Sequence, residues 1–302
     1  MSGLWVDTDF GFDDLWALLL LRHLGMQVAG ISLVAGNAPL PRVIANALGA
    51  QQAYGFDAPL FIGADRPLVR APETAERILG PRGMLSRGRH LPDVMPEQDL
   101  PDAAGGLQSW LRSAGAGEQR DILAIGPLTN IAVLVRDAPD LAQKITRLIW
   151  MGGSNGPGNH SAQAEFNALA DPEAAALVAR AGLPLDVIDL MLCRQVLFGP
   201  DDLPQCDGLT SNLLGGYLDI GLSRGRVAMA IYDPVAALSA CHPETFQFQR
   251  CSMTVSVHSD ASYGKTSFAE TRSGSTRIAV GTASNTAQIC LKALASEHAY
   301  VD

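Results

Sequence analysis

"LWVDTDFGFDDLWALLLLRHL", residues 4–24, predicts a strand, an acidic turn and a helix in succession. The apolar residues Leu4–Val6 are typical of a buried strand, and the mostly apolar residues 14–24 predict a helix. Four carboxylates lie close together after the strand begins: Asp7, Asp9, Asp13 and Asp14. Because like charges repel, water, hydrogen bonds or a metal ion must offset the repulsion among these carboxylates.

The alternation of strands and helices continues along the chain. The further predicted strands are Val28–Val34, Leu60–Gly63, Asp121–Ile125, Arg147–Met151 and Leu185–Ile188. The further predicted helices are 41–54, 127–137, 172–182, 208–222 and 283–296. After residue 250, "SMTVSVHSD" and "STRIAVG" predict a small antiparallel hairpin. No linker divides the chain, so we expect one α/β domain over residues 1–302, with a mainly parallel sheet flanked by helices.

Composition narrows the range of partners. The 302 residues carry a net charge of −9, which argues against a nucleic acid or an anionic membrane and favours a small neutral or cationic ligand. The longest apolar run, Leu15–Leu21, is too short to span a bilayer. The N-terminus does not resemble a signal peptide, and the five cysteines contain no CxxC pair. We therefore expect reduced thiols and a cytoplasmic location.

Three polar clusters are predicted at the carboxyl ends of strands, where open α/β sheets bind ligands. They are the four aspartates, "AGN" at 35–37 and "MGGSNGPGN" at 151–159. The aspartates suit a hard cation such as Ca²⁺ or Mg²⁺, although they could also be helix caps and solvated loop acids. An EF-hand is excluded because Phe12 and Leu18 occupy the positions that require Gly and Glu.

Further polar groups suggest a ligand with several hydroxyls, such as a sugar. Glu165 and Asn167 flank Phe166 in a glycine-rich loop, which could equally be an ordinary polar surface loop. Asp233, before Pro234, marks a helix start and could be a simple N-cap. Residues 64–106, rich in Pro, Gly and Arg, are interpreted as surface loops near the site that form a flap.

One competing motif is "GGSNG" at 152–156, which fits the G-x-S-x-G nucleophile pattern. That pattern requires a helix directly after the serine, whereas "PGNHSAQ" predicts a loop. Ser154 is therefore disfavoured as a nucleophile.

Taken together, the motifs resemble the inosine–uridine-type nucleoside hydrolase family. The resemblance covers nearly the whole chain, through "DTDFGFDD", "LVAGN", "IGPLTNIA", "MGGSNGPGNHSAQAEFN", "DPEAAA" and "YDP". It implies a single-domain, largely parallel α/β fold, one Ca²⁺ per subunit and hydrolysis of the N-glycosidic bond of ribonucleosides. It also implies a homodimer or homotetramer.

The resemblance further implies the roles of individual residues. Asp9, Asp14, Asp233 and the carbonyl of Ile125 would hold Ca²⁺, supported by Asp7 behind them. Asp9 would also be the general base toward the attacking water. The substrate contacts are implied for Asp13, Asn167 and Asp233 at the 2′- and 3′-hydroxyls, Asn159 and Glu165 at the 5′-hydroxyl, and Asn37 and Met151 along the pocket wall.

The chain departs from the family pattern at Phe10, where proline is usual, and at Ile125, where threonine is common. The flap reads "LGPRGML" at 79–85, without the usual His-Gly start. Most important is Tyr232, because many members have a histidine there that protonates the leaving base. We interpret Tyr232 as a stacking surface for a nucleobase, which favours purine ribosides, although it could simply pack beside the metal site.

Proton donors in place of that histidine could be solvent or the flap residues Arg87, Arg89 and His90. Two other functions also stay open at this point. The first is a noncatalytic nucleoside or ribose binder, suggested by the loss of the histidine. The second is an aspartate-nucleophile phosphatase, suggested by the D-x-D at residues 7–9. The phosphatase is opposed by Phe10-Gly11 after Asp9, where a Gly-Thr or Gly-Val pair is expected.

Overall fold

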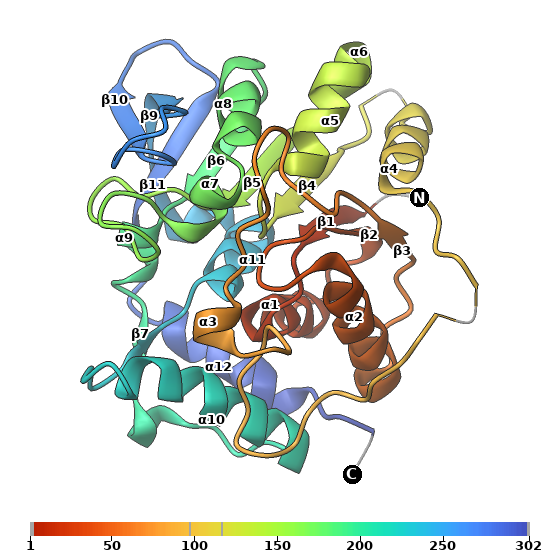
Figure 1. Ribbon diagram of the computed structural model, residues 1–302, viewed down its shortest axis with the longest axis vertical. Coiled ribbons are helices and arrows are strands. Elements are labelled where there is room, and N and C mark those ends of the chain that lie inside the picture. Colours follow the sequence, from red (N-terminus) through yellow and green to blue (C-terminus); the bar gives the residue numbers. More distant parts are fainter. Residues whose placement is uncertain (1–2, 97, 116, 301–302) are drawn as a thin grey trace.

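A nine-stranded sheet runs through the centre of the computed structural model, which describes residues 3–96, 98–115 and 117–300 (Figure 1). The strand order is β10-β9-β11-β6-β5-β4-β1-β2-β3, and only β9 pairs antiparallel to its neighbours. Its strands are β1 (Leu4–Thr8), β2 (Val28–Leu33), β3 (Leu60–Ile62), β4 (Asp121–Ala124), β5 (Arg147–Met151), β6 (Leu185–Ile188), β9 (Phe246–Val255), β10 (Thr266–Glu270) and β11 (Thr276–Thr282). A separate pair is formed by β7 (Leu197–Phe198) and β8 (Met229–Ala230).

Helices connect these strands. The longer ones are α1 (Phe12–His23), α2 (Leu40–Tyr54), α4 (Ala103–Arg112), α5 (Thr129–Asp137), α8 (Pro172–Arg180), α10 (Gly208–Leu222), α11 (Asp233–Cys241) and α12 (Thr286–Ser296). The short ones are α3 (Glu76–Leu79), α6 (Pro139–Ala142), α7 (Phe166–Ala170), α9 (Leu190–Cys193), and the 3-10 turns η1 (Pro200–Asp202) and η2 (Pro243–Thr245).

Both faces of the sheet are covered because the central strands are apolar on both sides. In β1, Val6 belongs to a core with α1, α2, α10, α11 and α12, whereas Trp5 belongs to a second core with α4, α5 and α8. Adjacent strand residues point to opposite faces, so one short run supplies both cores. The predicted α/β fold with a mainly parallel, helix-covered sheet is thus confirmed.

The six predicted parallel strands all form, but two details of the prediction were incomplete. The C-terminal hairpin is a three-stranded unit, and β11 joins it to β6 of the main sheet. Residues 64–106 are not only loop, because they contain α3 and the start of α4. Gly105 and Gly106 weaken the helical signal of α4, whose apolar face still packs onto the sheet through Leu107 and Leu111.

The chain reverses its direction of travel across the sheet at β1. From β1 it moves outward to β2 and β3, and it then returns to place β4 on the other side of β1. In open α/β sheets such a reversal leaves a crevice beyond the carboxyl ends of the two strands. Asp9 follows β1 and Ile125 follows β4, so the fold brings both residues to this crevice.

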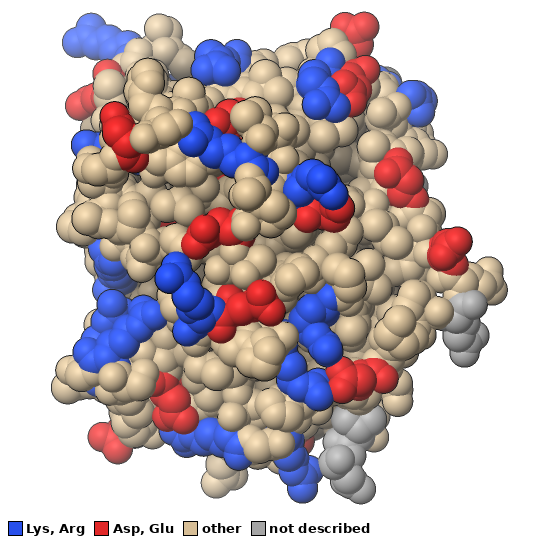
Figure 2. Space-filling model, in the orientation of Figure 1, with Lys and Arg blue, Asp and Glu red and all other residues tan. Residues whose placement is uncertain are grey.

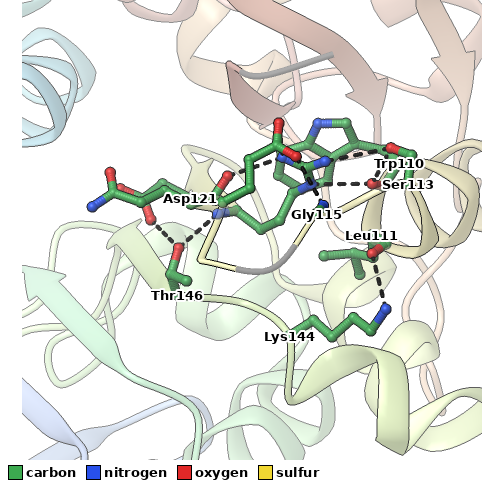
Figure 3. A network of polar contacts seen from close by, with 10 residues as sticks. Trp110, Leu111, Ser113, Gly115, Asp121, Lys144 and Thr146 are labelled. Carbon is green, nitrogen blue, oxygen red and sulfur yellow. Dashed lines mark hydrogen bonds and ion pairs between the residues drawn. The ribbon is translucent and has the colours of Figure 1, made fainter.

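At the opposite end of the strands, a network of polar contacts that includes Trp110 of α4, Asp121 of β4 and Thr146 before β5 connects these elements (Figure 3). Arg120 is fully buried; its side chain donates to the carbonyl of Trp110 (3.1 Å), and its backbone N–H donates to Thr146 (2.7 Å). Its guanidinium also lies 2.9 Å from Glu118 and packs over the Trp110 ring at 5.1 Å. These contacts fix the amino ends of the strands whose carboxyl ends form the crevice.

The surface carries mixed charge. On the face shown in Figure 2, basic and acidic side chains are interspersed. Among the residues described, no helix is both long and apolar enough to cross a bilayer.

Candidate active site

A pocket of about 800 Å³, counted up to the surrounding solvent, lies beyond the carboxyl ends of the central strands. Of the residues implied as metal ligands or substrate contacts, all except Asp14 line it: Asp9, Asp13, Asn37, Ile125, Met151, Asn159, Glu165, Asn167, Tyr232 and Asp233. They come from segments that follow β1, β2, β4, β5 and β8, which are far apart in sequence. The parallel sheet therefore assembles the site, as the strand-end clusters predicted.

Three carboxylates form the acidic floor of the pocket. Single oxygens of Asp13, Asp14 and Asp233 all lie within 4.8 Å of one another. Asp13 and Asp14 open α1, and Asp233 opens α11, so the positive ends of two helices face the same cluster. Burial and then the charges of Asp13, Asp14 and Asp9 raise the pKa of Asp233 well above its usual value. The amino ends of α1 and α11 therefore do not fully offset the repulsion among these carboxylates.

Asp9 lies beside the cluster, at the end of β1. Its carboxylate accepts hydrogen bonds from the backbone N–H of Asn37 (2.7 Å) and from the Asn37 side chain (3.0 Å). Gly36 makes this approach possible, because a Cβ there would lie only 2.1 Å from an oxygen of Asp9. Burial, followed by the charge of Asp14, raises the pKa of Asp9 well above its usual value. Asp9 is thus oriented by the turn after β2.

The turn between Asp9 and α1 has an unusual backbone. Phe10 adopts φ 46°, the only positive φ of a non-glycine residue among those described. Its N–H donates to Thr8 (3.0 Å), and its carbonyl accepts from Asn46 (3.2 Å). The next residue, Gly11, donates to Asp14 (2.7 Å), which also accepts from Thr8. The substitution at position 10 therefore shapes the turn that carries the acids.

Asp7 does not line the pocket, whereas Asp9, two residues later, does. The strand ends at Thr8, so the two-residue alternation no longer holds at Asp9. Asp7 is buried and accepts from Ser32 and from Asn130 (2.8 Å). Its backbone carbonyl accepts from Ile125 (2.8 Å). Any support that Asp7 gives to the site passes through the β4 end rather than through the carboxylates.

The opposite wall of the pocket contains the polar loop 152–167. Glu165 caps α7 and accepts from the N–H groups of Gly153, Asn167 and Ala168 at 2.8–3.0 Å. Burial raises the pKa of Glu165 to about 7, against the opposing effect of these bonds. The Asn167 side chain donates to the carbonyls of Met151 (3.0 Å) and Ile125 (3.3 Å). Ser154, the rejected nucleophile, donates to Pro157 (3.0 Å), and no helix follows it.

The other half of the pocket contains residues that the sequence did not single out. Tyr217 of α10 donates to Asp13 (3.3 Å) and to the carbonyl of Ala230 (3.1 Å). His160 bonds to Glu73 (3.0 Å) from the 64–106 segment. The remaining lining residues outside the predicted set are Ala75, Ile78, Leu79, Phe166, Ile220, Arg224, Arg226 and Met229. None belongs to a strand-end cluster, so neither pattern nor spacing identified them.

The flap residues proposed as proton donors lie elsewhere. Arg87 pairs with Asp219 (2.7 Å), and neither Arg89 nor His90 lines the pocket. The part of the segment that does reach the site is Ala75, with Ile78 and Leu79 of α3, the orange helix of Figure 1. The first part of the segment, around α3, lines the pocket, whereas the later part with Arg87, Arg89 and His90 does not. Closeness in sequence therefore did not identify the residues that reach the site.

The site geometry agrees with a comparison against known families. The family described as inosine-uridine preferring nucleoside hydrolase matches residues 4–294. The chain belongs to this family. It is therefore a nucleoside hydrolase, an enzyme that hydrolyses N-glycosyl bonds, which sets aside the noncatalytic binder and the phosphatase. The resemblance seen in the sequence motifs is confirmed.

Individual relatives support the same assignment. The non-specific ribonucleoside hydrolase RihC of Salmonella enteritidis is 35% identical over 267 residues, covering 86% of this chain and 85% of the relative. The purine-preferring ribonucleoside hydrolase from Gardnerella vaginalis superimposes with a TM-score of 0.86 over 97% of this chain and 98% of the other, at 22% identity. An inosine-guanosine nucleoside hydrolase gives 0.84 at 24% identity over 97% of each chain. The structural matches show that this nucleoside hydrolase shares their fold.

Proposed function

We propose that this nucleoside hydrolase uses Ca²⁺ to cleave ribonucleosides into ribose and free base, with purine ribosides preferred. The observation that carries the proposal is the cluster of three carboxylates, Asp13, Asp14 and Asp233, at a pocket that Asp13, Asp233 and Asp9 line. Hydroxyl-binding groups line the same pocket, which suits a ribose ring more than a planar base alone.

The residues present fit a hard divalent cation. Carboxylate and carbonyl oxygens are the ligands that Ca²⁺ prefers, and the cluster contains no thiol or imidazole. A cation would also offset the repulsion that, together with the larger effect of burial, raises the pKa values of Asp9 and Asp233. We assign Asp9, Asp14, Asp233 and the Ile125 carbonyl as its ligands, while Asp13 lies close enough to contribute. When bound, Ca²⁺ would orient the attacking water and ease its deprotonation.

The chain's own residues supply the remaining chemistry. Asp9 accepts the proton of the attacking water, held in place by its two hydrogen bonds from Asn37. Asp13, Asn167 and Asp233 bind the 2′- and 3′-hydroxyls, and Asn159 and Glu165 bind the 5′-hydroxyl. The ribose gains positive charge as the N-glycosidic bond breaks, and the nearby carboxylates stabilise that charge. Attack from the side opposite the base inverts the anomeric carbon.

Tyr232 supports the proposed preference for purines. It lines the pocket directly before Asp233, and burial raises the pKa of its hydroxyl to about 12. Such a phenol is a poor proton donor at neutral pH, so its contribution to the base is the face of its ring. A larger purine gains more from stacking than a pyrimidine does.

A panel of nucleosides tests the proposal. Inosine, guanosine, uridine and cytidine are assayed for release of ribose, with added Ca²⁺ and after treatment with chelator. We expect turnover that requires Ca²⁺ and a higher kcat/KM for the two purines. Full activity in metal-free protein would refute the metal assignment, and a preference for uridine would refute the base assignment.

Tyr232→Ala, measured on the same panel, separates stacking from simple packing. Loss of the ring should reduce kcat/KM for purines about 10-fold, since one aromatic stacking contact is worth about 0.5–1.5 kcal/mol. The pyrimidine values should fall less. Purine rates that do not change would show that Tyr232 only packs beside the metal site.

Assembly and location stay predictions. We expect a homodimer or homotetramer in the cytoplasm, and light scattering of the purified protein gives the subunit count directly.

A further inference from the structure

The connection between α10 and β8, residues 223–228, places two arginines on the rim of the pocket. Arg224 and Arg226 both line it, and they are the only lysines or arginines among its described lining residues. Both side chains are exposed. The rim of the pocket therefore carries two positive charges, whereas its floor is strongly acidic.

The neighbours of these arginines indicate which part of a nucleoside they face. Ile220 and Met229, at the ends of the same connection, line the pocket with Ile78 and Leu79 of α3. These apolar walls suit a nucleobase, whereas the carboxylates and amides gather around the ribose position. Arg226 also acts on Tyr232, because its positive charge partly opposes the effect of burial on the pKa of that hydroxyl. Arg226 therefore lies on the base side of the pocket.

Both guanidinium groups are available to a ligand. Within the described part of the chain, no ion pair involves Arg224 or Arg226. Asp219, an acid on the adjoining helix, is already held by Arg87 through two bonds of 2.7 and 2.9 Å. The backbone beneath the arginines is fixed, because the N–H groups of Arg224 and Arg226 both donate to the carbonyl of Gly221 at 3.1 Å.

The proposed reaction needs a positive group at this place. When the N-glycosidic bond breaks, its electron pair stays on the base, which becomes negatively charged unless a proton or a cation compensates. Tyr232 is a poor acid, and Arg87, Arg89 and His90 lie outside the pocket. An arginine keeps its proton at all working pH values, so it acts through charge and N–H donation.

We propose that Arg226, assisted by Arg224, stabilises the departing nucleobase by hydrogen bonds to its ring nitrogens or carbonyl oxygen. This inference rests on the proposed function and adds the residue that activates the leaving group. The carbon–nitrogen bond breaks, its electron pair moves to the base, and a water molecule forms the new carbon–oxygen bond. Asp9 takes one proton from that water, solvent supplies one proton to the base, and both arginines stay protonated throughout.

Substrates that differ only in the leaving group test the inference. Arg226→Ala, Arg226→Lys, Arg224→Ala and wild type are compared on inosine, guanosine and 4-nitrophenyl β-D-ribofuranoside. The nitrophenolate leaves without help, because it is already a stable anion near neutral pH. Val227→Ala is the matched control, since Val227 lies between the two arginines and is 88% exposed without lining the pocket.

We expect Arg226→Ala to lower kcat/KM for inosine and guanosine about 10- to 100-fold. This loss is smaller than the loss expected for a fully buried hydrogen-bond donor, because Arg226 is exposed to solvent. The nitrophenyl riboside should change by less than about 3-fold, within the range of an ordinary surface substitution. Arg226→Lys should recover part of the purine activity, and Arg224→Ala should have a smaller effect of the same kind. Val227→Ala should match wild type on all three substrates.

Two results would overturn the inference. One is an equal loss on nucleosides and nitrophenyl riboside, which would indicate a structural role. The other is unchanged nucleoside turnover in both the Arg226→Ala variant and the Arg224/Arg226 double alanine variant. Failure of the proposed function is distinguishable, because wild-type protein would then cleave neither the nucleosides nor the nitrophenyl riboside.

Discussion

The buried carboxylate of Asp186 and the buried carboxylates of Asp9, Asp14 and Asp233 differ in their charged partners. Asp186 of β6 is bound by Arg147 of β5 and Arg277 of β11, each with a nitrogen 2.6 Å from one of its oxygens. Asp9, Asp14 and Asp233 are equally buried, yet none of the described ion pairs involves them. Two arginines balance the charge of Asp186, whereas the other three carboxylates have no cationic partner among the described residues.

Asp186 is the paired group, because two arginines balance its charge, whereas Asp9, Asp14 and Asp233 form an unpaired group in which carboxylates crowd one another. A buried charge is costly unless it is paired or hydrogen-bonded, so crowding of unpaired carboxylates is a place where a bound cation would stabilise the fold. Variants that remove a charge from one group, with the other group as the control, test whether the two groups have different roles.

The largest expected effect is on turnover. Asp9→Asn keeps an oxygen and the contacts to Asn37 but removes the basicity, so kcat should fall by about 10³-fold. Steady-state assays on inosine measure this loss, and competition by ribose should still show binding. Asp186→Asn is the matched control, and its folded fraction should keep the wild-type kcat. A near-normal kcat for Asp9→Asn would eliminate it as the general base.

The next effect is on stability. Asp186→Ala leaves two arginines without their partner, and the free energy of unfolding should fall by about 3 kcal/mol. Urea denaturation monitored by circular dichroism gives this value. Added Ca²⁺ should not restore the loss, because Asp186 belongs to the paired group. A change below about 1 kcal/mol would mean that the arginines find water or other partners easily.

Removal of the metal should lower the stability of the protein, and this loss should depend on the unpaired group only. Saturation with Ca²⁺ at about 100 times its dissociation constant should raise the free energy of unfolding by about 2.7 kcal/mol. Thermal denaturation with Ca²⁺ and with chelator measures the shift in Tm. Asp14→Asn should abolish that shift, whereas Asp186→Asn should keep it. An equal shift in both variants would place the cation elsewhere.

The smallest expected effect concerns the ribose hydroxyls. Asn167→Ala removes one donor and should lower kcat/KM for inosine about 10-fold, the cost of about 1.4 kcal/mol for one hydrogen bond. Glu165→Gln should act in the same direction through kcat. Wild type should also discriminate against 2′-deoxyinosine, and the Asn167→Ala variant should do so less. Equal rates on inosine and 2′-deoxyinosine for wild type would contradict this role.

The sequence predicted the acidic half of the pocket because its residues follow strands directly. Parallel strands end at one edge of the sheet, so recognising Leu4–Val6 or Arg147–Met151 as strands also places the polar residues behind them. Arg224 and Arg226 could not be placed this way, because an exposed connection after α10 has no periodic signal. Asp186 was missed for another reason: its partners depend on the pairing of β6 with β11, which lies about ninety residues further along the chain.

The left-handed backbone at Phe10 limits which sequences can replace this turn. Proline, usual in the family at this position, holds φ near −65° and cannot adopt the 46° found here. Restoring the common residue would therefore force the Asp9–Gly11 backbone into another path and remove the contact between the Phe10 carbonyl and Asn46. If this turn were replaced by the turn of a relative, residue 46 of α2 would have to be replaced with it. The Asp9–Gly11 turn therefore depends on α2, through a residue more than thirty positions away in the sequence, for the hydrogen bond that holds its backbone.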